Sequence, residues 1–194
     1  DLNLMNKKIL ILMLSLVFTS EYDLTVPFNS KSEISYTGSH PAHSWTGISD
    51  NFKGGIVCNG LDDCSIKIQI PMGSFDSGSS SRDSNMLYYV ESNKYRYVTF
   101  YSKPFSISDD MLSVGGDVEL MGLIDFHGVE KEILFSTFIY PEGQFLRGKV
   151  SFDIYLSYHR VDRPSLLFVP ISDRIIIKCD LYCLIDEFRS YAEK

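Results

Sequence analysis

Hydrophobic and polar residues alternate along most of the chain, which is the two-residue period of a β-strand with one buried face. The clearest case is residues 64–70, in which Ile66, Ile68 and Ile70 share one face and the residues between them are polar. Similar patterns, separated by turns that contain Gly or Pro, predict about eight strands, over residues 30–38, 45–58, 64–70, 96–103, 112–126, 131–140, 149–158 and 173–181.

The stretch of residues 79–103 begins with an interruption of this pattern, between the third and fourth predicted strands, and ends in the fourth strand. A serine-rich run leads into a segment that predicts a short helix over residues 85–91, capped by Ser81 or Asp83. Helical spacing would turn three apolar side chains inward, those of Met86, Tyr89 and Val90.

The strands predict an all-β domain, because the chain has no strand–helix–strand units and no internal repeat. Aromatic residues make up 13% of the chain, which suits half-buried pleated surfaces. Both an antiparallel barrel and a sandwich fit this pattern, and an eight-stranded barrel either fills with side chains or holds one small ligand. Residues 184–193 predict a short amphipathic helix after the last strand.

The first 20 residues have the layout of a secretory signal peptide. A short segment with two lysines, residues 5–8, precedes the uncharged apolar run 9–18, which is too short for a permanent membrane span. Residues 1–4 precede the expected start methionine and are interpreted as non-native. We therefore expect a mature domain over residues 21–194, exported to the periplasm or secreted, with a retained anchor as the alternative.

The four cysteines fall into two pairs with different expected roles. Cys58 and Cys64 flank a hairpin-type loop, so an exported protein could join them in a disulfide. Cys179 and Cys183 would lie about 13 Å apart along one strand, at ~3.3 Å per residue. They are interpreted as small buried hydrophobic residues.

Charge and motif content exclude several function classes. The formal net charge of −7 and the absence of a basic cluster argue against nucleic acid and against an anionic membrane surface. His40 and His43 have the wrong spacing for a metal site, and no cofactor is expected. No nucleophile motif of a hydrolase is present, so an enzyme is not expected.

Five segments, in order along the chain, resemble the YceI-like family of bacterial periplasmic proteins. In the first, the family pattern of an aromatic residue, a histidine, a glycine and a phenylalanine matches Tyr36, His40, Gly47 and Phe52. Arg96 stands where the family usually has proline, and the span from Arg82 to Tyr95 is shorter than in many members. The segments are SEISYTGSHPAHSWTGISDNFKG, SIKIQIPMGSFDSGSSSRDSNM, KYRYVTFYS, LIDFHGVEKEILF and RPSLLFVPISDRIIIKCDL.

The resemblance implies an extended, lipocalin-like, eight-stranded antiparallel barrel whose apolar cavity holds a polyisoprenoid or another long-chain amphiphilic lipid, such as an isoprenoid quinone. It also implies that a homodimer can form, and it carries no catalytic residues. The alternative is a structural or stress-related interaction protein whose barrel is filled by its own side chains.

We expect the ligand to contact residues from the mouth and from the inner faces of the strands. His40, Arg82 and His127 are candidates for its head group. For Arg82 the alternative is an ion pair with Asp76 or Asp83, and for His127 it is a hydrogen-bonded turn. The predicted ligand-binding residues are Tyr36, His40, Trp45, Phe75, Arg82, Met86, Leu87, Tyr89, Phe100, Phe126 and Phe152.

Overall fold

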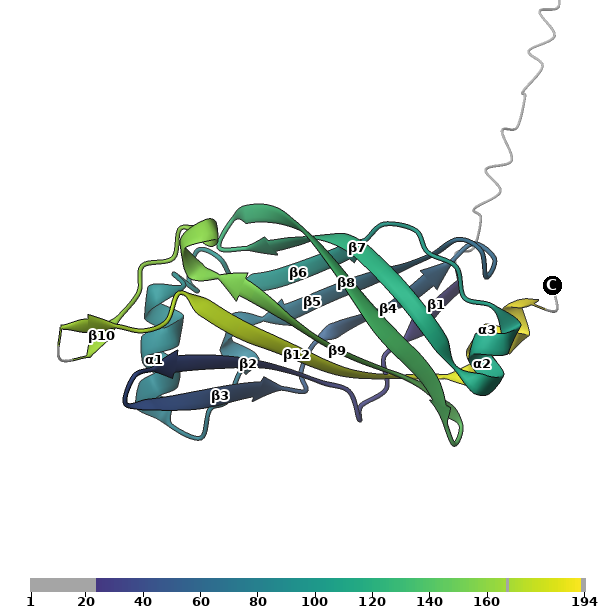
Figure 1. The fold of residues 1–194 in the computed structure, drawn as a ribbon, viewed down its shortest axis with the longest axis horizontal. Helices are drawn as coiled ribbons and strands as arrows, with labels where there is room; N and C mark the ends of the chain where they lie inside the picture. The colour runs from purple at the N-terminus through teal and green to yellow at the C-terminus, as the bar shows by residue number, and fades with distance from the viewer. Residues whose placement is uncertain (1–23, 167, 193–194) are drawn as a thin grey trace, which may run out of the picture.

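The computed structural model describes residues 24–166 and 168–192, so the predicted leader at residues 1–20 lies outside the described part. An antiparallel sheet of ten strands dominates, in the order β1-β4-β5-β6-β7-β8-β9-β12-β2-β3, and curls into a half-barrel (Figure 1). Its strands are β1 (Leu24–Pro27), β2 (Glu33–His40), β3 (His43–Ser49), β4 (Lys53–Cys58), β5 (Cys64–Pro71), β6 (Tyr97–Ser102), β7 (Gly116–Phe126), β8 (Val129–Glu142), β9 (Phe145–Tyr155) and β12 (Arg174–Leu184).

The all-β prediction is confirmed, but the main sheet has ten strands rather than the eight predicted. The additional strands are β1 and the product of a split, because residues 45–58 form β3 and β4 instead of one strand. β3 pairs with β2 at one edge of the sheet, whereas β4 pairs with β1 and β5 near the other edge. Gly55 permits the β1–β4 contact, since a Cβ atom there would lie 2.3 Å from the carbonyl oxygen of Val26.

The helices also differ from the prediction in position. Helix α1 (Ser80–Tyr89) begins several residues before the expected start, and its N-cap is Ser79 rather than Ser81 or Asp83. The Asp83 carboxylate instead accepts hydrogen bonds from the Ser77 amide. Because of the two additional strands, α1 connects the fifth and sixth strands.

A second helix replaces the first part of the strand predicted at residues 112–126. Ser108 caps α2 (Asp109–Val114) by accepting a hydrogen bond from the Met111 amide, and Gly115 follows it with φ of +86°. The expected terminal helix is present as α3 (Ile185–Ala192). The other described elements are two 3₁₀ turns, η1 (Met72–Ser74) and η2 (Leu156–His159), and a second sheet of two short strands, β10 (Ser165–Leu166) and β11 (Val169–Pro170).

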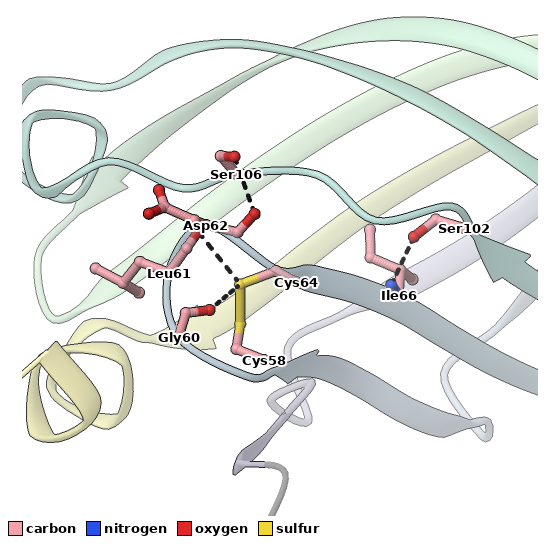
Figure 2. Close-up of a disulfide and its surroundings, with 8 residues drawn as sticks. All are labelled: Cys58, Gly60, Leu61, Asp62, Cys64, Ile66, Ser102 and Ser106. Carbon is pink, nitrogen blue, oxygen red and sulfur yellow. Dashed lines mark hydrogen bonds between the residues drawn. A yellow bond between two sulfur atoms is a disulfide. The ribbon is translucent and has the colours of Figure 1, made fainter. Parts of the chain in front are cut away.

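Helices α2 and α3 pack at one end of the barrel, which we call the closed end (Figure 1). Three large side chains there are almost fully buried, with 0–1% exposure: Ile107, Leu112 and Phe188. A Cys58–Cys64 disulfide joins β4 to β5 at the same end, and Ser106 ties the intervening loop to the segment before α2 by donating to the Asp62 carbonyl (Figure 2).

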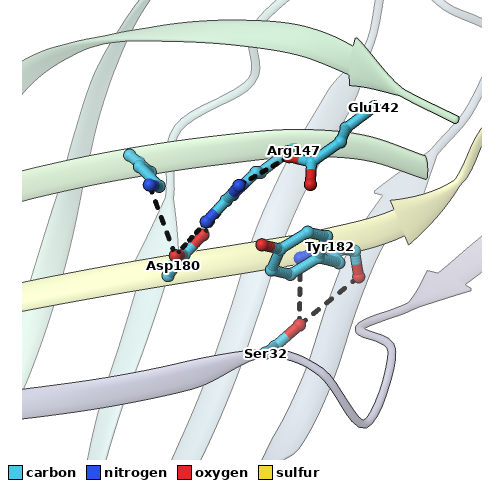
Figure 3. A network of polar contacts seen from close by, with 6 residues as sticks. Ser32, Glu142, Arg147, Asp180 and Tyr182 are labelled. Carbon is cyan, nitrogen blue, oxygen red and sulfur yellow. Dashed lines mark hydrogen bonds and ion pairs between the residues drawn. The ribbon is translucent and has the colours of Figure 1, made fainter.

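A polar network also fastens the closed end (Figure 3). Arg147 on β9 donates two hydrogen bonds, of 2.8 and 2.6 Å, to the carboxylate of Asp180 on β12. This bonding holds the pKa of Asp180 below its usual value. The buried hydroxyl of Ser32 accepts a 2.9 Å bond from the Tyr182 amide, so the chain before β2 is fixed to β12.

Candidate functional site

A cavity of about 410 Å³ lies within the curled sheet. Side chains along a strand point alternately to its two faces, so the cavity wall is built from apolar residues at alternate positions of strands such as β5 and β7. On β5 and β7 these residues are Ile66, Ile68, Ile70, Val118, Leu120, Ile124 and Phe126.

One end of the cavity reaches the surface, and we call this end the mouth. Four cavity-lining residues there are also exposed to solvent: His43, Asn85, Asp162 and Ser165. They come from β3, from α1 and from the segment after η2. At the closed end, by contrast, the lining residues Ile107, Leu146 and Cys183 are buried.

Ten of the eleven residues predicted to contact a ligand line this cavity. The exception is Leu87, which is partly buried and packs against the core cluster that includes Val90. Met86, Tyr89 and Val90, which were predicted to face inward from the helix, all line the cavity. The ten residues are Tyr36, His40, Trp45, Phe75, Arg82, Met86, Tyr89, Phe100, Phe126 and Phe152.

Two aromatic–glycine pairs build the wall formed by β2 and β3. Tyr36 lies opposite Gly47, and Trp45 lies opposite Gly38. A Cβ atom at Gly47 would come within 2.3 Å of the Tyr36 ring, and one at Gly38 within 2.7 Å of the Trp45 ring. Both glycines therefore make room for a ring that lies across the neighbouring strand.

Tyr36 and His40 each carry a buried polar atom without a hydrogen-bond partner among the described residues, Oη and Nε2 respectively. The Nδ1 atom of His40 accepts a hydrogen bond from the Ala42 amide, so the neutral ring carries its proton on Nε2. Burial, with the nearby Asp83 carboxylate, raises the pKa of Tyr36 to about 12. Both groups are thus donors that a ligand oxygen could satisfy.

Arg82 on α1 also borders the mouth. Its guanidinium lies 5.9 Å from the centre of the Trp45 ring and donates a 3.2 Å hydrogen bond to the Ser77 carbonyl. The alternative of an ion pair with Asp76 or Asp83 is wrong, because neither carboxylate is within ion-pair distance of Arg82 in the described structure.

His127 does not line the cavity and is a hydrogen-bonded turn residue, as the alternative interpretation held. It has a φ of +55° between β7 and β8. Its Nδ1 lies 2.9 Å from the His159 carbonyl oxygen and its Nε2 lies 3.0 Å from the Glu91 carboxylate. His127 therefore fastens the end of α1 to the barrel beside the mouth.

The free cysteines Cys179 and Cys183 line the cavity wall on β12. Burial raises the pKa of Cys179 to about 12 and raises that of Cys183 as well. Both thiols therefore stay protonated at neutral pH and act as small apolar groups. Within residues 24–166 and 168–192, no group of three or more side chains is arranged to hold a metal ion.

Sequence reasoning missed Asn85, Asp162 and Ser165 at the mouth, and it missed the small β10–β11 sheet (Ser165–Leu166 and Val169–Pro170). The hairpin falls within the fifth segment that resembles the family, and no strand is predicted there before residue 173. Its one available signal was a run without charge at residues 164–172. None of the helices that the structure describes has the length and apolar character needed to cross a membrane.

Solved structures with the same fold share 16% sequence identity with this chain. A polyisoprenoid binding domain from Saccharophagus degradans, implicated in plant cell wall breakdown, aligns over 83% of this chain and 98% of its own with a TM-score of 0.70. BcnA from Burkholderia cenocepacia aligns over 80% and 98% with a TM-score of 0.67. A YceI protein from Campylobacter jejuni aligns over 70% and 82% with a TM-score of 0.56.

No curated protein matches the sequence. The family model of the YceI-like domain, however, matches residues 27–182, which span the sheet from β1 to β12. This match covers most of the chain and agrees with the resemblance of the five sequence segments and with the fold. The chain therefore belongs to the YceI-like family.

Proposed function

We propose that this protein is an exported binding protein that holds a polyisoprenoid, or another long-chain amphiphilic lipid, in its barrel. The cavity carries the proposal: it is apolar, opens at the mouth and measures about 410 Å³. Small-molecule sites occupy about 300–1,000 Å³. The polyisoprenoid binding domain with the same fold supports the choice of ligand class.

The shape of the cavity favours a long chain over a compact ligand. The lining residues of β12 run from Ile175 to Cys183, a distance of about 26 Å at ~3.3 Å per residue. Each methylene group transferred from water into this wall contributes about 0.8 kcal/mol. An extended hydrocarbon therefore gains affinity along the whole length of the barrel.

The polar groups at the mouth would bind the head of such a lipid. Tyr36 Oη and His40 Nε2 are buried donors with no partner in the described part of the chain, and Arg82 adds a cation at the mouth. An oxygen-containing head group, such as the ring carbonyl of an isoprenoid quinone, would satisfy them. This arrangement supports binding rather than catalysis. The proposal also includes export directed by residues 1–20 and the formation of a homodimer.

Lipid extraction tests the proposal directly. We expect an organic-solvent extract of the purified protein to contain a long-chain lipid that mass spectrometry can identify, and we expect lipid-free protein to take up an isoprenoid quinone. Lipid-free preparations that repeatedly fail to take up quinone would contradict the proposal and favour the structural alternative, in which the barrel binds nothing.

Two adjacent isoleucines provide a matched control for that experiment. Ile177 lines the cavity, whereas Ile176 does not. Ile177→Trp should lower the amount of bound lipid at least tenfold, because the larger ring occupies the space of the chain. Ile176→Trp, a change of the same size on the opposite face of β12, should leave the bound lipid unchanged.

A further inference from the structure

A small hairpin formed by β10 and β11 projects from the mouth end of the barrel, beyond α1 (Figure 1). Its base belongs to the cavity, since Pro164, Ser165 and Ile171 line the wall. The Ser172 amide donates a 2.8 Å hydrogen bond to the Ser39 carbonyl and so fixes the hairpin to the end of β2. The projecting tip is therefore held next to the opening of the cavity.

The tip of this hairpin is apolar and faces solvent. Phe168 is 101% exposed and Val169 is 43% exposed. Residues 164–172 contain no charged side chain, although the chain as a whole carries 18 basic and 25 acidic residues. A fully exposed phenylalanine in an uncharged segment contributes nothing to the core, so its apolar surface is available to another apolar phase.

The backbone conformation of Phe168 also supports a functional role for this residue. Leu166 pairs with Val169 across the hairpin, and Phe168 has a φ of +67°. A positive φ in a hairpin favours Asn and Gly, because these residues adopt it at little steric cost. A bulky aromatic residue is unfavourable there, and such a conformation is typical of functional positions.

Tyrosines accompany the tip on the same end of the molecule. Tyr158 in η2 is 61% exposed and Tyr88 on α1 is 75% exposed. Tyr155 lies beside Tyr158, with ring centres 5.1 Å apart. Tyrosine rings are enriched at membrane–water interfaces, where the apolar ring meets the acyl chains and the hydroxyl group meets water.

We propose that the tip of the β10–β11 hairpin inserts into the surface of an electrically neutral lipid bilayer and holds the mouth of the cavity against it. The occupant is a neutral surface because the protein has a net charge of −7, which opposes attraction to anionic lipids. Insertion of apolar side chains supplies the affinity instead. The inference extends the proposed function and rests on it for its purpose, since a lipid carrier must receive its ligand from a membrane.

The test uses lipid-free full-length protein and phosphatidylcholine vesicles that contain no isoprenoid, so that docking and ligand binding can fail separately. We expect the protein to co-sediment with the vesicles at an affinity that changes little with salt. Combined Phe168→Ser and Val169→Ser substitution should lower the partition coefficient at least tenfold, from the apolar area removed. Uptake of quinone from detergent solution by this variant should stay unchanged.

Val114 provides the matched control, because it is 75% exposed on α2 at the closed end. Val114→Ser should not alter vesicle binding. A Phe168→Trp variant, in a Trp45→Phe background, should retain binding, and its emission should shift to the blue and be quenched by lipids brominated on their acyl chains.

Three results would overturn the inference. One is no co-sedimentation of the wild-type protein with neutral vesicles, whether or not it takes up quinone. Another is equal loss of binding in Val114→Ser and in the hairpin variant. The third is a dimer in sedimentation analysis that the hairpin substitutions dissociate, without vesicle binding, since the tip would then be a contact between two copies of this chain.

Discussion

The two ends of the barrel are built in opposite ways. At the closed end, α2 and α3 cover the sheet, a disulfide joins β4 to β5, and the polar side chains of Arg147 and Asp180 satisfy one another. At the mouth, the buried Tyr36 Oη and His40 Nε2 atoms have no partner in the described structure, and Phe168 projects into solvent. One end is arranged for stability and the other for access.

The difference explains how a small domain can keep an apolar cavity open. An unfilled interior and unpaired buried donors are unfavourable to folding. The dense packing and cross-links at the closed end offset that cost without entering the mouth. The comparison predicts that equivalent substitutions will have different consequences at the two ends.

The largest expected difference in stability is between the substitutions of two phenylalanines. Phe188 on α3 is 0% exposed and Phe168 is 101% exposed. Phe188→Ala should lower the free energy of unfolding by about 3–5 kcal/mol, because it removes a fully packed ring. Phe168→Ala should change it by less than about 0.5 kcal/mol. Urea denaturation measures both, and similar losses in the two variants would remove the distinction between the ends.

Loss of the disulfide should have the next largest effect. Cys58 and Cys64 are six positions apart, so removing the cross-link from so short a loop should lower the free energy of unfolding by about 2 kcal/mol. The double variant Cys58→Ala with Cys64→Ala tests this in urea. A reducing agent should bring the wild-type protein to the level of the variant and leave the variant itself unchanged. If the variant matches the oxidised wild type, the loop does not stabilise the closed end.

At the mouth, removal of a polar group should raise the free energy of unfolding rather than lower it. Tyr36→Phe deletes a buried hydroxyl that has no partner among the residues the structure describes, so it should raise the free energy of unfolding of lipid-free protein by about 1 kcal/mol. The same change should weaken quinone binding roughly fivefold if the hydroxyl donates to the ligand. Denaturation and quinone titration of one preparation measure both. Unchanged quinone affinity would remove Tyr36 from the head-group site.

The smallest expected effect is a pH dependence at the mouth end. Burial lowers the pKa of His159 below its usual value of 6.5, so the folded protein favours the neutral ring. The unfolded chain binds this proton more readily, and its contribution to stability is therefore complete above pH 6.5 and declines as the pH falls below it. Urea midpoints at pH 7.5 and 5.5 should show a shallower decline for His159→Asn than for the wild type. Identical slopes would mean that another group titrates.

Local pattern was sufficient for the inner wall of the site. The alternation on β5 and β7 placed their isoleucines and valine correctly, because side chains on a strand point to opposite faces in turn. The same reasoning failed at residues 45–58, where the chain leaves β3 at one edge of the sheet and enters β4 near the other. Two glycine-containing strands in succession have the same local pattern as one bent strand.

At the mouth, too, local sequence pattern does not determine every contact. Leu87 was predicted to contact a ligand although it lies off the helical face of Met86, Tyr89 and Val90; those three line the cavity, and Leu87 packs in the core instead. The unpartnered state of Tyr36 Oη depends on every neighbour of the ring, and no local pattern records it.

The sequence by itself determined that the chain is an all-β domain of the YceI-like family with apolar inner faces, since these properties follow from side-chain period and from motifs in order. Only the tertiary structure decided that the sheet has ten strands, that one end is closed by α2 and α3, and that the uncharged hairpin at residues 164–172 stands at the open end. Such properties depend on contacts between segments distant in the chain, and tertiary packing rather than local preference decides them.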